Sequence, residues 1–161
     1  MVDKEQLQMM SMFMDLASMN NAAQHLFDIS QKELDKANYI LPSAVLKAFS
    51  AELGIKSILT MNGVKQNHTH NLESLFFQLD SESKTEIQRS TIDFYNERNS
   101  NKIDFDSELH NIAGSFESFR YFYENINLNT TNLGNFMFLA CFCFAVIVQF
   151  TKVEKEFVKD K

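Results

Sequence analysis

The first candidate for chemistry in this chain is an acid–base pair, Glu52 and Lys56, in the segment Ala51-Glu52-Leu53-Gly54-Ile55-Lys56. An acid placed four residues before a base favours an ion pair along a helix. Glu52 also borders the apolar positions Phe49 and Leu59. Two interpretations therefore stay open: an exposed pair that supports the helix, or a partly buried polar contact.

A second candidate is the pair His68 and His70, in a polar stretch before an apolar segment. A His-x-His pair without an accompanying cysteine or carboxylate pattern matches none of the usual zinc spacings, so we expect no metal site. His70 is expected to open a helix, where its ring can bond a neighbouring helix end or an acidic partner such as Glu52. A structural histidine and a catalytic or pH-sensitive one both fit this position.

A third candidate is Arg120, in the segment Phe119-Arg120-Tyr121-Phe122-Tyr123-Glu124. It follows Phe116 by four residues, so it projects from the apolar face of its expected helix and needs a partner. Glu124 and Glu117 offer a local ion pair. Alternatively, Arg120 enters a cleft between helices and binds a phosphate group, which suits the planar guanidinium.

Other enzyme chemistries find little support. The chain has no glycine-rich phosphate loop, no G-x-S-x-G elbow and no cysteine nucleophile with an activating histidine in view. Cys141 and Cys143 lie in an apolar run and point about 200° apart on a helix, so they are badly placed to ligate one metal. We expect both thiols to be buried and reduced, and we predict no metal and no cofactor.

The elements that position these residues are expected to be helices, because 4 Gly and 1 Pro are few for a β fold. Apolar periodicity predicts an all-α fold, a single domain over residues 1–161 with a Phe-rich core. The expected helices span 4–36 with a break allowed near Asn20-Asn21, 41–61 opened by Pro42 and ended by Gly63, 70–79 capped by Thr69, 83–99, a fifth from Asp104 or Asp106 to 124, and 132–158.

The net charge, the N-terminal segment and the longest apolar run limit which partners and which compartment we expect. A net charge of −6 disfavours wholesale attraction to nucleic acid, although a local basic groove is compatible with it. The polar segment Met1–Gln8 has no apolar core of a signal peptide, which predicts a cytoplasmic protein. The apolar run Phe136–Val148 is shorter than the roughly 20 residues that cross a bilayer, so a central helix and no membrane span are expected.

Three segments together resemble a HEPN-type domain, the helical family named for higher-eukaryote and prokaryote nucleotide binding. They are Ala51–Lys56, His70–Phe76, which is similar to the family's H-x-L-x-x-L-F, and Arg120–Glu124. The likeness covers residues 41–124. It implies an up-and-down bundle of four main helices with short additional ones, assembled as a homodimer. It also implies a nucleotidyltransferase-type partner, or a place in phage-defence or toxin–antitoxin systems.

Active members of that family are metal-independent ribonucleases with an R-x4-6-H motif. In this chain the corresponding positions after Arg120 are Asn125, Ile126 and Asn127, and no histidine follows. An asparagine cannot act as an acid or base near neutral pH, so catalysis by the family mechanism is not expected.

The leading hypothesis is therefore a non-catalytic or degenerate HEPN-like protein that binds a nucleotide, RNA or a protein partner through four residues: Glu52, Lys56, His70 and Arg120. One alternative is a metal-independent ribonuclease toxin with a non-standard site drawn from Arg120, Glu124 and His70. Another is a purely structural protein-interaction module.

Overall fold

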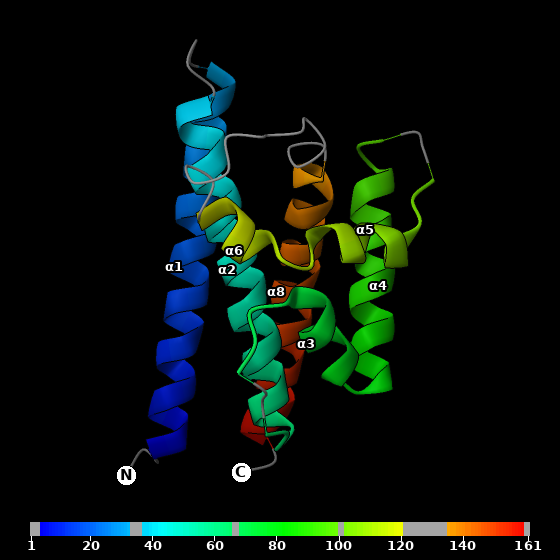
Figure 1. Cartoon of the computed structure of the whole chain (residues 1–161). Coiled ribbons are helices and arrows are strands. Elements are labelled where there is room, and N and C mark those ends of the chain that lie inside the picture. Colours follow the sequence, from blue (N-terminus) through cyan, green and yellow to red (C-terminus); the bar gives the residue numbers. More distant parts are fainter. Residues whose placement is uncertain (1–3, 33–36, 66–67, 100–101, 121–134, 160–161) are drawn as a thin grey trace.

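The computed structural model describes residues 4–32, 37–65, 68–99, 102–120 and 135–159 (Figure 1). Within these ranges, the side chains of residues 4–10, 13, 37, 38 and 118–120 lie outside the description. The described residues form helices and no strand, which confirms the all-α prediction.

Four long helices form the body of the molecule and run alternately up and down (Figure 1). Neighbouring helices pack in the order α1, α2, α8, α4, so α8 lies between α2 and α4. The predicted bundle of four main helices is confirmed. Their bounds are α1 Lys4–Lys32, α2 Ala37–Met61, α4 Ser81–Asn96 and α8 Phe136–Lys159.

Three short helices cross in front of α2 and α8 in the view of Figure 1. They are α3 Leu72–Gln78, α5 Phe105–Ile112 and α6 Ser115–Arg120. Helices α3 and α6 contact α2, and α3 also contacts α5. The short helices therefore cover one face of the bundle and bring residues distant in sequence against α2.

The predicted start of the third helix was wrong. Asn71, not Thr69, is its N-cap, because the Asn71 side chain accepts a hydrogen bond from Ser74 N at 2.8 Å. Thr69 Oγ1 instead accepts from Asn71 N at 3.1 Å. His70 consequently lies just before the helix rather than opening it.

The predicted long fifth helix was also wrong, because it is divided into α5 and α6 around Ala113 and Gly114. Asp104 caps α5 as expected. The break leaves the Ala113 carbonyl outside a helical ladder, where it accepts a hydrogen bond from Leu72 N at 2.8 Å. Since the first N–H groups of a helix lack internal partners, this bond completes the start of α3.

Two further boundaries differ from expectation at the first helix pair. Helix α1 continues through Asn20 and Asn21 without a break, and α2 starts at Ala37, before Pro42. Pro42 is the sixth residue of α2, so its missing N–H removes one helical hydrogen bond in the second turn. Gly63 ends this part of the chain with φ of 71°, the left-handed conformation expected of it.

The core is rich in phenylalanine, as predicted. The rings of Phe76, Phe105, Phe138 and Phe142 lie with centroids 5.4 to 6.4 Å apart. Such clusters add specific ring geometry to the burial of apolar area.

Helices α2 and α8 approach closely at Gly54. Ala44, Ala48 and Ala51, also small residues of α2, are fully buried. A Cβ atom on Gly54 would lie 2.5 Å from Val146 Cγ1. Only glycine therefore permits this contact between the two helices.

Helix α8 is long and apolar enough to cross a membrane, on length and composition alone. The core helix of a soluble protein passes the same test, and 56% of the most apolar window of α8 is buried within the bundle. The apolar run Phe136–Val148 forms the first part of α8, within the helix predicted over 132–158.

Candidate functional site

Glu52 is the centre of a polar cluster on the α2 face that is crossed by α3 and α6. Its side chain is only 3% exposed, and its Oε1 accepts a hydrogen bond from Lys56 Nζ at 2.6 Å. The ion pair predicted from the spacing is confirmed. Of its two interpretations, the structure supports the buried contact, because a carboxylate so little exposed requires partners.

His70 bonds the same carboxylate from the segment before α3. Its Nδ1 lies 2.9 Å from Glu52 Oε1 and 3.1 Å from Oε2. Because an ionised carboxylate can only accept, Nδ1 carries the proton in this arrangement and donates it to the bond. The imidazole is 49% exposed, and no described residue bonds its Nε2. The expected contact between His70 and Glu52 is confirmed.

Aromatic rings fix the position of the imidazole. The Phe116 ring stacks on Phe49 with centroids 5.2 Å apart, and it lies 5.4 Å from the His70 ring. Helix α6 therefore contributes to the site through Phe116. We call these five residues, Glu52, Lys56, His70, Phe49 and Phe116, the Glu52 cluster.

Arg120 and Glu124 were the remaining predicted site residues. Arg120 is the last residue of α6, one turn after Phe116, and its side chain lies outside the described atoms. Glu124 lies outside the described residues altogether. The structure thus brings Glu52, Lys56 and His70 together, while the roles of Arg120 and Glu124 stay predictions.

The Glu52 cluster has the parts for proton transfer or anion binding. A buried carboxylate that accepts from Nδ1 fixes the tautomer and orientation of an imidazole, whose Nε2 then faces outward. The Lys56 ammonium beside it supplies positive charge at 19% exposure. A small anion at this surface would meet both groups at once.

The other histidines do not join this cluster. His110 Nδ1 lies 3.1 Å from Glu73 Oε2 and connects α5 to α3, with a side chain 76% exposed. His25 and His68 are exposed. Over the described ranges, no three metal-ligating side chains gather in one place. His110 and Glu73 do provide a second His–Glu pair, with a carboxylate 28% exposed against 3% for Glu52.

Sequence reasoning did not identify Lys47, which is 5% exposed on α2. Its Nζ donates to Asn20 Oδ1 at 2.8 Å and Gln24 Oε1 at 3.3 Å, and burial lowers its pKa below the ordinary lysine value. Lys47 also borders a pocket of about 420 Å³. The signal that could have revealed it is its position between Ala44, Ala48 and Ala51, on the buried stripe of α2.

The two cysteines are free and buried, as predicted. Complete burial raises the pKa of the Cys143 thiol to about 12, and burial also raises that of Cys141. Cys143 Sγ donates a weak hydrogen bond to Asn20 Oδ1 at 3.8 Å. Neither thiol has the lowered pKa that a nucleophile or a metal-binding thiolate requires.

The chain matches no protein-family model, no curated protein and no solved structure. The likeness to HEPN domains therefore rests on the three sequence segments. The geometry of the described residues provides the independent support for a function.

Proposed function

We propose that the chain is a cytoplasmic, homodimeric HEPN-like protein that binds a phosphate group of a nucleotide or RNA at the Glu52 cluster without cleaving it. The observation that carries the proposal is the buried Glu52 carboxylate, which bonds both His70 and Lys56. Two nitrogen groups are thereby pre-positioned at one partly open surface, which lowers the cost of ordering them around a ligand.

Phosphate fits the donors of this cluster. The Lys56 ammonium donates to phosphate oxygens, and the His70 ring donates to them through Nε2 in its protonated form; charge-assisted bonds of this kind are the strong ones. The partly buried rings of Phe49 and Phe116 lie next to His70. Aromatic rings beside a basic group are the elements on which nucleobases stack.

The overall charge favours a small ligand over a long nucleic acid. A net charge of −6 disfavours the binding of a duplex, which requires many phosphates to be neutralised. A mononucleotide or a short single strand requires only a local site. The proposal includes the settings that the family resemblance implies, namely a nucleotidyltransferase-type partner, phage defence or a toxin–antitoxin pair.

Nucleotide binding is tested by isothermal titration with AMP, ATP, oligo(A) and adenosine. The phosphorylated ligands should bind, and adenosine should not. Lys56→Met and His70→Gln should each weaken AMP binding about tenfold, the loss of one charge-assisted bond. Comparison of AMP with oligo(A) then distinguishes a free nucleotide from RNA.

The matched control is His110→Gln, which alters the exposed His–Glu pair. It should bind AMP like the wild type. Equal binding of AMP and adenosine would contradict a phosphate site, and so would an equal loss of affinity in the His110 and His70 variants.

The Glu52–His70 pair also favours a second candidate, the metal-independent ribonuclease with a non-standard site. A carboxylate that orients an imidazole is the arrangement by which a histidine becomes a general base. The test is total-RNA integrity in cells induced for the wild type, His70→Gln or Arg120→Ala. Fragmentation by the wild type alone assigns a nuclease. Intact RNA without nucleotide binding leaves the protein-interaction module.

A further inference from the structure

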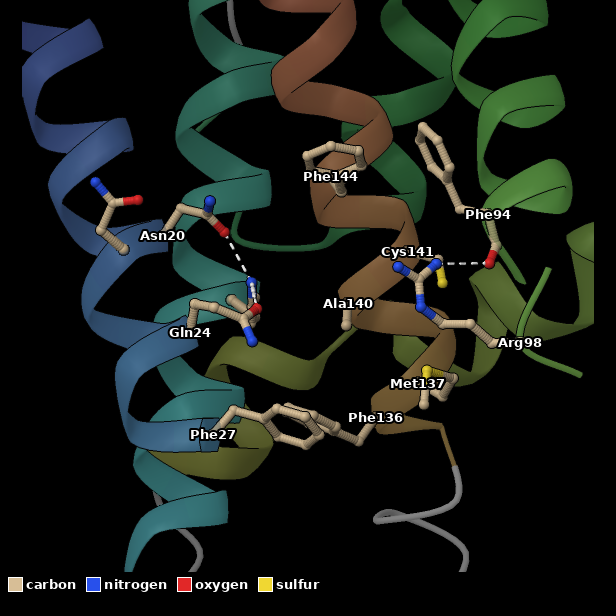
Figure 2. Close-up of a pocket in the computed structure, with 12 residues that line it drawn as sticks. Asn20, Gln24, Phe27, Phe94, Arg98, Phe136, Met137, Ala140, Cys141 and Phe144 are labelled. Atoms are coloured by element: carbon tan, nitrogen blue, oxygen red, sulfur yellow. Dashed lines mark hydrogen bonds between the residues drawn. The ribbon is translucent and has the colours of Figure 1, made fainter. Parts of the chain in front are cut away.

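A second site lies on the other side of the bundle from the Glu52 cluster. The short helices cross in front of α2 and α8 in Figure 1, and they pass behind these helices in Figure 2, which looks into the pocket. The pocket, about 420 Å³ in volume, is lined by α1, α2, α8 and the end of α4. A volume of this size is typical of small-molecule sites.

Lys47 is the exceptional residue of this pocket. It is 5% exposed, yet its two hydrogen-bond acceptors, Asn20 Oδ1 and Gln24 Oε1, are neutral amide oxygens. No carboxylate of the described residues lies within ion-pair distance of its ammonium. An ammonium has three N–H donors, so one of them has no partner in the described part of the chain.

Such a lysine is costly for the folded chain. Amide dipoles satisfy hydrogen bonds but supply no opposite charge, and a buried ion without a counter-ion is destabilising. The lowered pKa of Lys47 has burial as its main cause. Cys143, Asp28 and Cys141 oppose that shift but do not cancel it. An anion seated beside Nζ would supply the absent charge.

The rest of the pocket is mostly apolar, with one aromatic pair at each end (Figure 2). Phe27 and Phe136 stack with centroids 5.1 Å apart, and Phe94 meets Phe144 edge-on at 4.8 Å. Ala140 lies between the two pairs. These walls fit a hydrocarbon or aromatic body and offer no donors to a second charged group.

Arg98 lies on the side of the pocket across from Asn20 and Gln24 (Figure 2). Its Nη1 donates to the Phe94 carbonyl at 2.9 Å, and its side chain is 57% exposed. Arg98 therefore adds positive potential at the rim, while Lys47 supplies the buried positive charge. Both basic groups favour an anion over a neutral or cationic ligand.

We infer that this pocket binds an organic monocarboxylate with an apolar body, its carboxylate on Lys47 Nζ and its tail between the Phe27–Phe136 and Phe94–Phe144 pairs. A carboxylate matches the single buried ammonium in charge. A phosphate monoester, with about two negative charges near neutral pH, would exceed the charge of that single ammonium.

The test is isothermal titration of the intact chain with sodium decanoate, kept below its micelle concentration, and with decan-1-ol as the neutral analogue of equal length. Decanoate should bind one molecule per chain, at least tenfold more tightly than decanol. Equal affinity for the two ligands would overturn the role of Lys47, because the apolar walls alone would then explain binding.

Three variants locate the site. Lys47→Met should weaken decanoate binding at least tenfold and leave decanol unchanged. Lys56→Met, a matched loss of a lysine from the same helix, should leave decanoate unchanged. Ala140→Phe keeps Lys47 but fills the pocket, so both ligands should lose affinity. Undiminished decanoate binding by the Lys47 and Ala140 variants would place the ligand elsewhere and overturn the inference.

The two sites are distinguishable in the same set of proteins. AMP binding at the Glu52 cluster should persist in Lys47→Met, and decanoate binding should persist in His70→Gln. Circular dichroism and the unfolding temperature verify that each variant is folded. If Lys47→Met does not fold, Ala140→Phe together with the decanoate–decanol comparison still decides the result.

Discussion

Lys47 and Glu52 lie little more than one turn apart on α2 and contact opposite sides of the bundle. Both are almost completely buried. Glu52 is bonded by two basic side chains, Lys56 and His70, whereas Lys47 is bonded only by neutral amides of α1. Among the described residues, the same helix therefore contains one buried charge with an ion-pair partner and one with no opposite charge at bonding distance.

The difference separates two uses of buried polarity. Where opposite charges surround a group, removing that group leaves its partners unpaired, so the folded state depends on it. Where only dipoles surround a charge, removal relieves desolvation, so the charge is disposable for folding and available to a ligand. Glu52 should thus matter most for stability, and Lys47 most for binding.

The largest effect on stability is expected from Glu52→Ala. The change removes the carboxylate that joins α2 to the segment before α3, and should lower the free energy of unfolding by about 3 kcal/mol. Urea denaturation at neutral pH measures it. Lys56→Met, a partly exposed partner, should cost only about 1 kcal/mol. If Glu52→Ala changes the free energy of unfolding by less than about 0.5 kcal/mol, on the order of the extrapolation error, Glu52 is no more important for stability than Lys47.

A middle-sized effect is expected at alkaline pH from Cys143, beside Lys47. Its pKa is raised to about 12 in the folded chain from an ordinary 9.0, so the unfolded chain loses its proton first. Stability should be complete below pH 9 and fall as pH rises toward 12, by about 2 kcal/mol near pH 10.5. Cys143→Ala should lack this component in urea titrations. An identical pH dependence for both proteins would show that the thiol is not sequestered.

The smallest effect on stability is expected from Lys47→Met, less than about 1 kcal/mol at neutral pH, since methionine retains the apolar stem and removes the buried charge. Burial lowers the pKa of Lys47 from 10.5, so above the folded pKa the unfolded chain binds more protons. Lys47 should therefore contribute a rise in stability with pH up to about 10.5. Comparing the free energies of unfolding of the variant and the wild type across this pH range isolates the contribution of Lys47. If the substitution lowers the free energy of unfolding by about 3 kcal/mol, as the loss of a buried ion pair does, Lys47 is a structural charge like Glu52.

The Glu52–Lys56 pair of the Glu52 cluster could be predicted from the sequence because it follows local spacing. Glu52 and Lys56 are related by one turn, whereas the contact of Glu52 with His70, 18 residues away, also depends on the turn at Gly63. The helix class and the four main helices follow from apolar periodicity. The i, i+4 pair and the apolar periodicity depend only on the spacing of residues along one helix, which can be read from the sequence.

The Lys47 pocket could not be predicted in the same way. It requires Asn20 and Gln24 from α1 to meet Lys47 and the aromatic pairs of α4 and α8, which depends on how whole helices pack. The division of α5 from α6 has a similar cause, because the Ala113 carbonyl finds its partner in Leu72, far away in sequence. Tertiary bonds of this kind override local helix preference.

The contact between Gly54 and Val146 links two positions that are distant in sequence. A side chain at 54 would meet the Val146 methyl at 2.5 Å, and valine has few rotamers with which to move away. A defect caused by Gly54→Ala should therefore be corrected by a second-site suppressor, Val146→Ala, although each change is harmful alone. A genetic selection for restored folding would recover position 146, and the two residues should be inherited as a compatible pair.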